Sequence, residues 1–197
     1  MTRLLNGIVA FGSVLLLAVT LIGAGFAAVA IPDAATATLS RALSGCDQPN
    51  TPFTADELAS MAIAGKHYTF DDNDREKLDA AIAEANAAAE ADGHATASTR
   101  ESAARTLPAD AISHLDDVYR VASVAKPALV IVAVLCIAGL AHVAVRISRR
   151  ALGRTLMAGG GLVLAAFCAL GAWAAIDFDG LFAAFHSLFF QAGTWTF

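Results

Sequence analysis

The sequence predicts an all-α membrane protein with three transmembrane helices. Two observations support this fold class. The first is composition: 57% of the 197 residues are hydrophobic and only 16% are charged, whereas soluble domains are closer to half apolar and a quarter charged. The second is that the apolar residues gather in three long runs. A spanning helix needs about 20 mostly apolar residues, and lipid offers no hydrogen-bond partner to the backbone of any other single segment.

The first apolar run predicts a transmembrane helix over residues 1–31. Only small or weakly polar residues interrupt it. A secretory signal peptide is the alternative, but its apolar core is typically about 7–15 residues long, much shorter than this run. We therefore predict a retained helix. A lipoprotein-like cleavage box ends at Cys46, but residues 32–45 separate it from the run, so we interpret it as a chance match.

The segment 32–126 is predicted to form a helical domain outside the membrane. Thr54 and Glu57 fit a capping box, which marks the start of a helix. We expect this helix to end near Gly65. Residues 66–70, which include aromatic and β-branched side chains, are expected to be extended or irregular.

An alanine-rich helix is expected next, from the acidic cluster at residues 71–74 to about Ala91. Carboxylates offset the positive end of a helix dipole, and the cluster lacks the glycine and glutamate of an EF-hand calcium loop. Residues 94–105 are small and polar, which is typical of a mobile loop. Pro108 should begin a further helix, and Pro127 should open the second spanning run as a first-turn residue or a kink.

The second and third spanning helices are predicted over residues 127–145 and 156–176. The link between them, residues 146–155, holds four arginines and no acid. Short cytoplasmic loops collect such charge, so we place this link and the N-terminus in the cytoplasm. The segment 32–126 is then outside the plasma membrane. Its acidic residues outnumber its basic ones, which argues against a nucleic-acid partner.

The last segment, residues 177–197, predicts an amphipathic helix on the external membrane surface. Large aromatic residues recur at three- and four-residue spacing around His186: Phe182, Phe185, Phe189 and Phe190. Trp195 and Phe197 fit the aromatic belt of a membrane interface.

Two histidines are the candidate catalytic residues. His114 and Asp117 are three residues apart, on one helical face. A carboxylate beside an imidazole fixes its tautomer, as in acyl-transfer sites; an ordinary surface pair is the alternative. His186 is an ionisable residue at membrane depth, which is costly and indicates function, unless it is a plain interfacial histidine. The other histidines are expected at the protein surface or the membrane interface: His67, His94 and His142.

Two motifs resemble a known family. His-x-x-Asp-Val, at His114, Asp117 and Val118, precedes a spanning helix, and Phe-x-x-Phe-His-x-x-Phe-Phe followed by Trp-x-Phe covers residues 182–197. With two spanning helices between them, these motifs resemble the bacterial integral membrane family that includes the lipoprotein intramolecular transacylase, Lit. Members usually continue to a further spanning helix. We therefore expect this sequence to be a C-terminally truncated member of a four-helix family.

The resemblance implies an acyltransferase, if the chain is complete. Its reaction would move the sn-2 acyl chain of a diacylglyceryl lipoprotein to the amine of the N-terminal cysteine. The resemblance implies His186 as the principal base, His114 as its partner and Asp117 as the orienting carboxylate, and the two histidine roles can be reversed. No metal or cofactor is expected. The expected partners are membrane lipids and the lipoprotein substrate.

Two alternatives stay open at the level of residues. One is a metal-dependent membrane hydrolase in which His114, Asp117 and His186 bind zinc, because three protein ligands and a water form a catalytic zinc site. The other is a non-enzymatic integral membrane protein, such as an assembly partner or a transporter fragment. The third apolar run carries no charge, which argues against ion transport.

Overall fold

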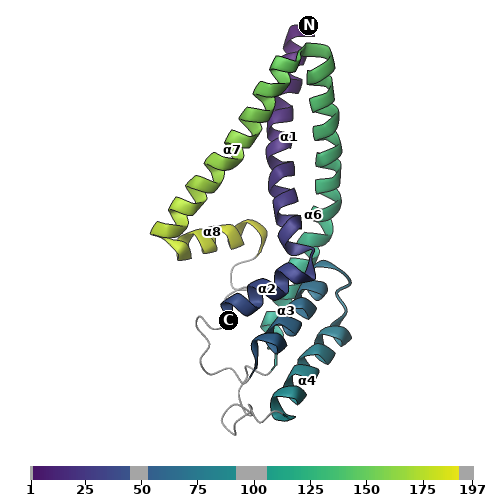
Figure 1. Ribbon diagram of the computed structural model, residues 1–197, viewed down its shortest axis with the longest axis vertical. Helices are drawn as coiled ribbons and strands as arrows, with labels where there is room; N and C mark the ends of the chain where they lie inside the picture. Colours follow the sequence, from purple (N-terminus) through teal and green to yellow (C-terminus); the bar gives the residue numbers. More distant parts are fainter. Residues whose placement is uncertain (1, 45–52, 92–105, 191–197) are drawn as a thin grey trace. The chain divides into compact units, whose positions relative to one another are not determined.

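The computed structural model describes residues 2–44, 53–91 and 106–190. These residues are helical throughout their regular elements and include no β-strand. Among them, three helices are long and apolar enough to cross a membrane: α1 (Thr2–Ala30), α6 (Ala109–His142) and α7 (Arg149–Ile176). The shorter helices are α2 (Asp33–Leu43), α3 (Ala55–Phe70), α4 (Arg75–Ala91) and α8 (Phe178–Phe189) (Figure 1). The predicted all-α membrane fold is confirmed.

The chain divides into two compact units. We call Met1–Ala27 with Val124–Phe189 the long-helix unit, and Ala28–Ser123 with Phe190 the short-helix unit. The helix α6 contributes to both. Its 34 residues span roughly 50 Å at 1.5 Å per residue, more than the ~30 Å of a hydrocarbon core. Part of α6 must therefore lie outside lipid, and the boundary between the units falls within this helix.

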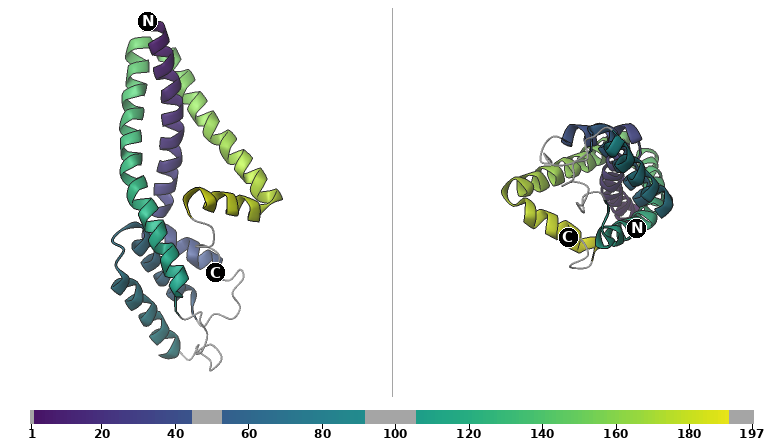
Figure 2. Two further views of the ribbon diagram at one scale, coloured as in Figure 1. Left: turned by 180° about the vertical axis from the view of Figure 1, so that it is seen from behind. Right: turned by 90° about the horizontal axis from the view of Figure 1, so that it is seen from below.

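Small residues allow the helices of the long-helix unit to approach closely. A Cβ atom on Gly139 would lie 2.4 Å from Oγ of Ser13, and one on Gly159 would lie 2.6 Å from Cδ2 of Leu17. Within this unit α1 and α6 run side by side (Figures 1 and 2). Membrane helices associate through such close contacts because lipid is as apolar as their own side chains.

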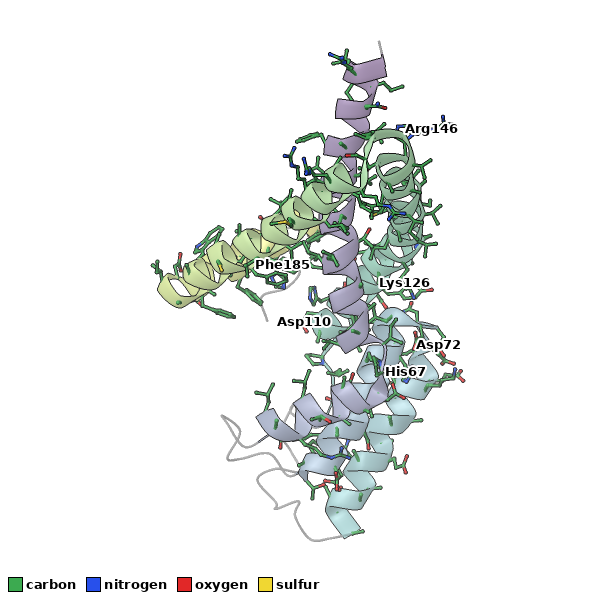
Figure 3. The ribbon with its side chains drawn as sticks, turned by 45° about the horizontal axis from the view of Figure 1, so that its top comes forward. His67, Asp72, Asp110, Lys126, Arg146 and Phe185 are labelled. Carbon is green, nitrogen blue, oxygen red and sulfur yellow. The ribbon has the colours of Figure 1, made fainter. Side chains whose placement is uncertain are left out.

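Polar groups mark the end of the long-helix unit where α6 leads into α7. The ring of His142 donates from Nε2 to the amide oxygen of Asn6 at 3.1 Å, which joins α6 to α1. A π-helical turn, Val143–Ile147, follows, and the Ser148 hydroxyl caps α7 by accepting a backbone hydrogen bond at 3.0 Å. The exposed Arg146 lies at this turn (Figure 3).

The short-helix unit has a buried apolar core. One cluster joins α3 to α4 and consists of Phe53, Leu58, Met61, Ala85 and Ala89. Another joins α3, α4 and α6 and is built on Tyr68, Leu78 and Ile112. The second cluster therefore packs the first part of α6 against the α3–α4 pair.

Lys66 connects the end of α1 to α2 and α3. Its Nζ donates to the carbonyl oxygen of Ile31 at 2.9 Å and pairs with Asp33, although the side chain is only 9% exposed. The hydrogen bond from Lys66 is the main reason that the pKa of Asp33 lies below its ordinary value. His67 also engages Asp33, through Nε2 at 3.1 Å, and its Nδ1 pairs with Asp71. His67 is thus partly exposed, and its two ring nitrogens face two carboxylates.

The expected start signals of α3 and α4 are present. Thr54 and Glu57 form the predicted capping box, in which each side chain accepts a hydrogen bond from the other residue's backbone amide. Asp74 accepts hydrogen bonds from the amides of Glu76 and Lys77, at 3.0 and 3.3 Å. The acidic cluster therefore caps α4, as predicted.

Other local predictions are wrong. Residues 66–70 are helical and complete α3, because Tyr68 is only 5% exposed and packs on Leu78. Pro127 lies inside α6, which excludes the first-turn alternative and leaves the kink as a prediction. The helix α2 is absent from the predicted elements, and α7 begins at Arg149 within the expected loop. Some predictions fall outside the described residues: those on Cys46, His94, the 94–105 loop, Trp195 and Phe197.

Candidate functional site

His186 lies in an aromatic face of α8. The helix buries none of its residues, and most of its large apolar side chains are exposed: Phe178, Phe182, Phe185, Leu188 and Phe189. The His186 ring is 3.9 Å from the ring of Phe182, centroid to centroid, and meets Phe185 edge-on at 5.5 Å. The predicted helical spacing of the aromatic motif is therefore confirmed for residues 178–189, and the histidine stands among the phenylalanines.

A backbone carbonyl fixes the tautomer of His186. Its Nδ1 is 2.8 Å from the carbonyl oxygen of Phe182, one helical turn earlier. A carbonyl only accepts hydrogen bonds, so Nδ1 must carry a proton. In the neutral ring the lone pair then sits on Nε2, and this is the atom that can take a proton from a reactant.

His114 lies on α6 in the short-helix unit. Its ring meets the ring of Phe190 edge-on, with centroids 4.9 Å apart and an interplanar angle of 66°. The Nδ1 atom of His114 is shielded from solvent. Phe190 follows α8 directly and comes four residues after His186 in the chain. The last residue of the Phe-x-x-Phe-His-x-x-Phe-Phe motif therefore contacts the histidine of the other motif.

Asp117, the predicted orienting carboxylate, pairs with a neighbouring arginine. Its Oδ1 accepts a hydrogen bond from Nη1 of Arg120 at 2.7 Å, in a partly exposed pair three residues apart. Such a pair on a helix surface is worth a few tenths of a kcal/mol. The role of Asp117 toward His114 stays a prediction.

The adjacent carboxylate, Asp116, binds α6 to the α3–α4 pair. The Tyr68 hydroxyl donates to Oδ1 of Asp116, and Nδ2 of Asn73 donates to the same oxygen at 3.3 Å. Asn73 also donates to the carbonyl of Tyr68 at 3.3 Å and has a φ of 53°, a left-handed conformation that asparagine adopts more readily than most residues. Burial, and then the bond to Asp116, raise the pKa of the Tyr68 hydroxyl above 10.0, so this hydroxyl stays protonated and donates.

Sequence reasoning missed Tyr68, Asn73 and Asp116. Tyr68 and Asp116 are 48 residues apart in the chain, so no local motif joins them. One signal was available: Asp116 is four residues after the apolar Ile112, which puts the two on one helical face. Of two adjacent aspartates, the one on the apolar face is the one that needs a buried partner.

The short-helix unit also contains a pocket beside Tyr68, with a volume of about 380 Å³. Its lining comes from α3, the turn after it and the start of α4: Ser60, Ile63, Ala64, His67, Tyr68, Asp72, Asp74 and Lys77. His67 and Asp72 lie on the same side of this helix pair (Figure 3). The predicted catalytic residues are not part of the lining. Within residues 2–44, 53–91 and 106–190, no group of three or more His, Cys, Asp or Glu side chains is placed to hold a metal ion.

The fold and the two motifs define an α-helical membrane protein with a histidine next to each of two spanning helices. The family model of the lipoprotein intramolecular transacylase Lit matches residues 91–197, more than half of the chain, and the chain therefore belongs to the Lit family. The matched region contains His114, Asp117 and His186. Neither the curated proteins nor the solved structures include a match to this chain.

Proposed function

We propose that this protein is a membrane acyltransferase acting on a diacylglyceryl lipoprotein. It moves the acyl chain from the sn-2 oxygen of the glyceryl group to the α-amine of the N-terminal cysteine, which leaves a lyso-form lipoprotein. Membership of the Lit family supports this reaction, because both histidine motifs lie in the matched region. The structural observation that carries the proposal is the His186 ring, held by the Phe182 carbonyl in an exposed aromatic face.

The reaction needs one base and one acid. The amine nitrogen attacks the ester carbonyl carbon and loses a proton as the amide bond forms. The bond from that carbon to the glyceryl oxygen breaks, and the oxygen takes up a proton. Protons and electrons balance, so the transfer needs no co-reactant. We assign Nε2 of His186 as the base, His114 as the acid and Asp117 as the residue that orients His114; the roles of the two histidines can be exchanged.

The helix α8 suits a lipid-linked substrate. With 12 residues it is too short to span a bilayer, and a helix with a large apolar face can lie in the membrane interface. Its exposed phenylalanines include two whose rings contact the ring of His186, Phe182 and Phe185. Acyl chains can therefore pack against the same face that presents the base.

We place both motifs outside the plasma membrane and the arginine turn in the cytoplasm, which is where such short basic links are found. The test is labelling of intact cells by a membrane-impermeant maleimide. On a cysteine-free background, Ala80→Cys should react and Arg150→Cys should react only after the cells are opened. Labelling of Arg150→Cys but not of Ala80→Cys in intact cells would mean that the topology is the opposite of the one proposed.

The reaction is tested by mass spectrometry of a model lipoprotein's N-terminal peptide, in cells that lack any other N-acylating enzyme. The unmodified chain should yield an amide-linked acyl chain and a free glyceryl hydroxyl. His186→Ala should lower this product at least about 100-fold, the lower end of what a general acid or base contributes. His114→Ala should lower it about as much, because acid and base act as a unit, and the effect of Asp117→Asn should be milder or comparable.

Ser187→Ala is the matched control on α8, because this hydroxyl only donates to the carbonyl of Ala184. His67→Ala controls for the loss of a histidine elsewhere. Both variants should give normal product. Absence of product from the unmodified chain would refute the proposed reaction, and normal product from His186→Ala would refute the assigned base. Activity that a chelator removes and zinc restores would favour the metal-dependent hydrolase.

A further inference from the structure

We propose that Tyr68, Asn73 and Asp116 form a clamp that fixes the rotation of α6 and so positions His114. These three are positioning residues, because they act through the backbone of α6 and do not touch the reacting atoms. The inference rests on the proposed function for its catalytic consequence. The geometry of the clamp does not depend on that function.

The hydrogen bonds of the clamp converge on one oxygen atom. Oδ1 of Asp116 accepts from the hydroxyl of Tyr68 on α3 and from the amide of Asn73 in the α3–α4 turn. The bond from Asn73 to the Tyr68 carbonyl closes the triangle. Asn73 lies in the turn between α3 and α4 with a left-handed φ of 53°, and its side chain reaches the carboxylate of Asp116 from this turn.

The clamp and the histidine lie on different faces of α6. At about 100° per residue, Asp116 is about 40° from Ile112 and about 200° from His114 around the helix axis. The side of Ile112 and Asp116 packs on α3 and α4. On another side, the ring of His114 meets Phe190 at 4.9 Å. A rotation of α6 that broke the clamp would therefore move the His114 ring away from the ring of Phe190.

Apolar packing alone does not select one rotation as sharply. Ile112 and Leu115 contact the second cluster, and apolar contacts have no preferred direction. Hydrogen bonds weaken steeply as their angles open. The Tyr68 hydroxyl is in a side chain only 5% exposed, so separating it from Asp116 would leave a buried donor without its acceptor. The hydrogen bonds of the clamp therefore favour one rotation of α6, which the apolar contacts of the core do not select.

A direct test measures the reactivity of His114 in the purified full chain. Diethyl pyrocarbonate modifies exposed imidazoles, and mass spectrometry gives the rate for each histidine. Tyr68→Phe keeps the ring in the core and removes only the donor, and it should raise the modification rate of His114 several-fold. Asp116→Ala should do the same from the α6 side. Asp116→Asn keeps an acceptor oxygen and should leave the rate near that of the unmodified chain.

Met61→Ala is the matched control. Met61 packs in the cluster that joins α3 to α4, so its loss softens the same unit without touching the clamp. It should leave the modification rate of His114 unchanged. An unchanged rate in Tyr68→Phe would overturn the proposal, and so would an equal rise in Met61→Ala, which would indicate general loosening.

The consequence for acyl transfer is measured separately. Tyr68→Phe should lower kcat roughly 10- to 100-fold with little change in KM, because small misplacements of a catalytic group have effects of this size. Asp116→Asn should restore most of the rate. If the modification rate rises while kcat stays normal, the clamp is supported and the catalytic assignment of His114 fails. If Asp116→Asn is as damaging as Asp116→Ala in both assays, the charge matters and the positioning role is wrong.

Discussion

The two units of this protein differ in which side chains they bury: the long-helix unit buries small side chains, and the short-helix unit also buries large apolar ones. In the long-helix unit large residues face outward, such as Ile137 and Phe167 at 68% and 58% exposed, while Ser13 is 1% exposed. In the short-helix unit the buried positions include Tyr68 and Leu78, and ion pairs lie on the surface. The first pattern needs lipid around it, and the second is that of a domain in water.

The difference shows that one chain is stabilised by two physical mechanisms. Water drives the apolar side chains of the short-helix unit together. Lipid gives the long helices no such drive, and close contact between small residues takes its place. Substitutions and conditions should therefore affect one unit at a time, and hydrogen exchange in detergent can follow each unit by its own peptides.

The largest effect is expected from Leu78→Ala. Leu78 is 2% exposed in the cluster that joins α3, α4 and α6. Truncation of a buried leucine costs roughly 2–5 kcal/mol in transfer free energy and cavity formation. Amides in α3 and α4 should lose protection accordingly, while those of α1 and α7 should not. An equal loss in α1 and α7 would mean that the two units unfold as one.

A smaller effect, confined to the other unit, is expected from Gly159→Leu. A Cβ atom there would lie 2.6 Å from Cδ2 and 3.2 Å from Cβ of Leu17, so α1 and α7 must move apart. Overpacking of this kind costs about 1–3 kcal/mol, measured as faster exchange in α1 and α7. Gly161→Leu is the matched control, because nothing lies within 4 Å of a Cβ at that position. Equal loss from both variants would show that helix contact is not the cause.

The smallest effect is expected from acid. Hydrogen bonds from Lys66 and Lys77 are the main reasons that the pKa values of Asp33 and Asp72 lie below the ordinary 3.8. A carboxyl with a lowered pKa in the folded state stabilises the fold above its unfolded pKa, and this contribution is lost as pH falls through the folded pKa. Protection of the short-helix unit should therefore decline below pH 3.8, modestly because the pairs are exposed.

The measurement is hydrogen exchange corrected for the intrinsic effect of pH. The helices α1 and α7 contain no acidic residue and should keep their protection. Lys77→Gln removes the partner of Asp72. In this variant the short-helix unit should lose less protection in acid than it does in the unmodified chain. A decline of the same size in α1 and α7 would contradict the assignment of this response to the short-helix unit.

Features encoded within a few residues were predictable from the sequence. The apolar runs identified the three long helices, because length and composition decide whether a segment can span lipid. Thr54 and Glu57 identified the start of α3, since a capping box is complete within four residues. The spacing of Phe182, Phe185 and Phe189 identified α8 in the same way. His114 and His186 were selected by motif, and their roles stay proposals.

Features that depend on distant partners were not predictable. Residues 66–70 look extended by composition, but burial of Tyr68 against Leu78 keeps them helical. The spacing from Ile112 puts Asp116 on the apolar face of α6, but the sequence does not reveal its partner, because Tyr68 lies 48 residues away in the chain. The helix α2 buries only Ala37, and its first residue follows Pro32 without a side-chain cap, so no strong local signal marks it.

The hydrogen bond between Asn6 and His142 joins residues 136 positions apart, and this separation has a consequence for biogenesis. Asn6 is synthesised early, and its partner His142 follows only after residues 28–123 of the short-helix unit have been synthesised. A polar side chain near lipid gains from finding a partner. Because His142 is synthesised so late, we expect this hydrogen bond between α1 and α6 to form only after the residues between Asn6 and His142 have been synthesised.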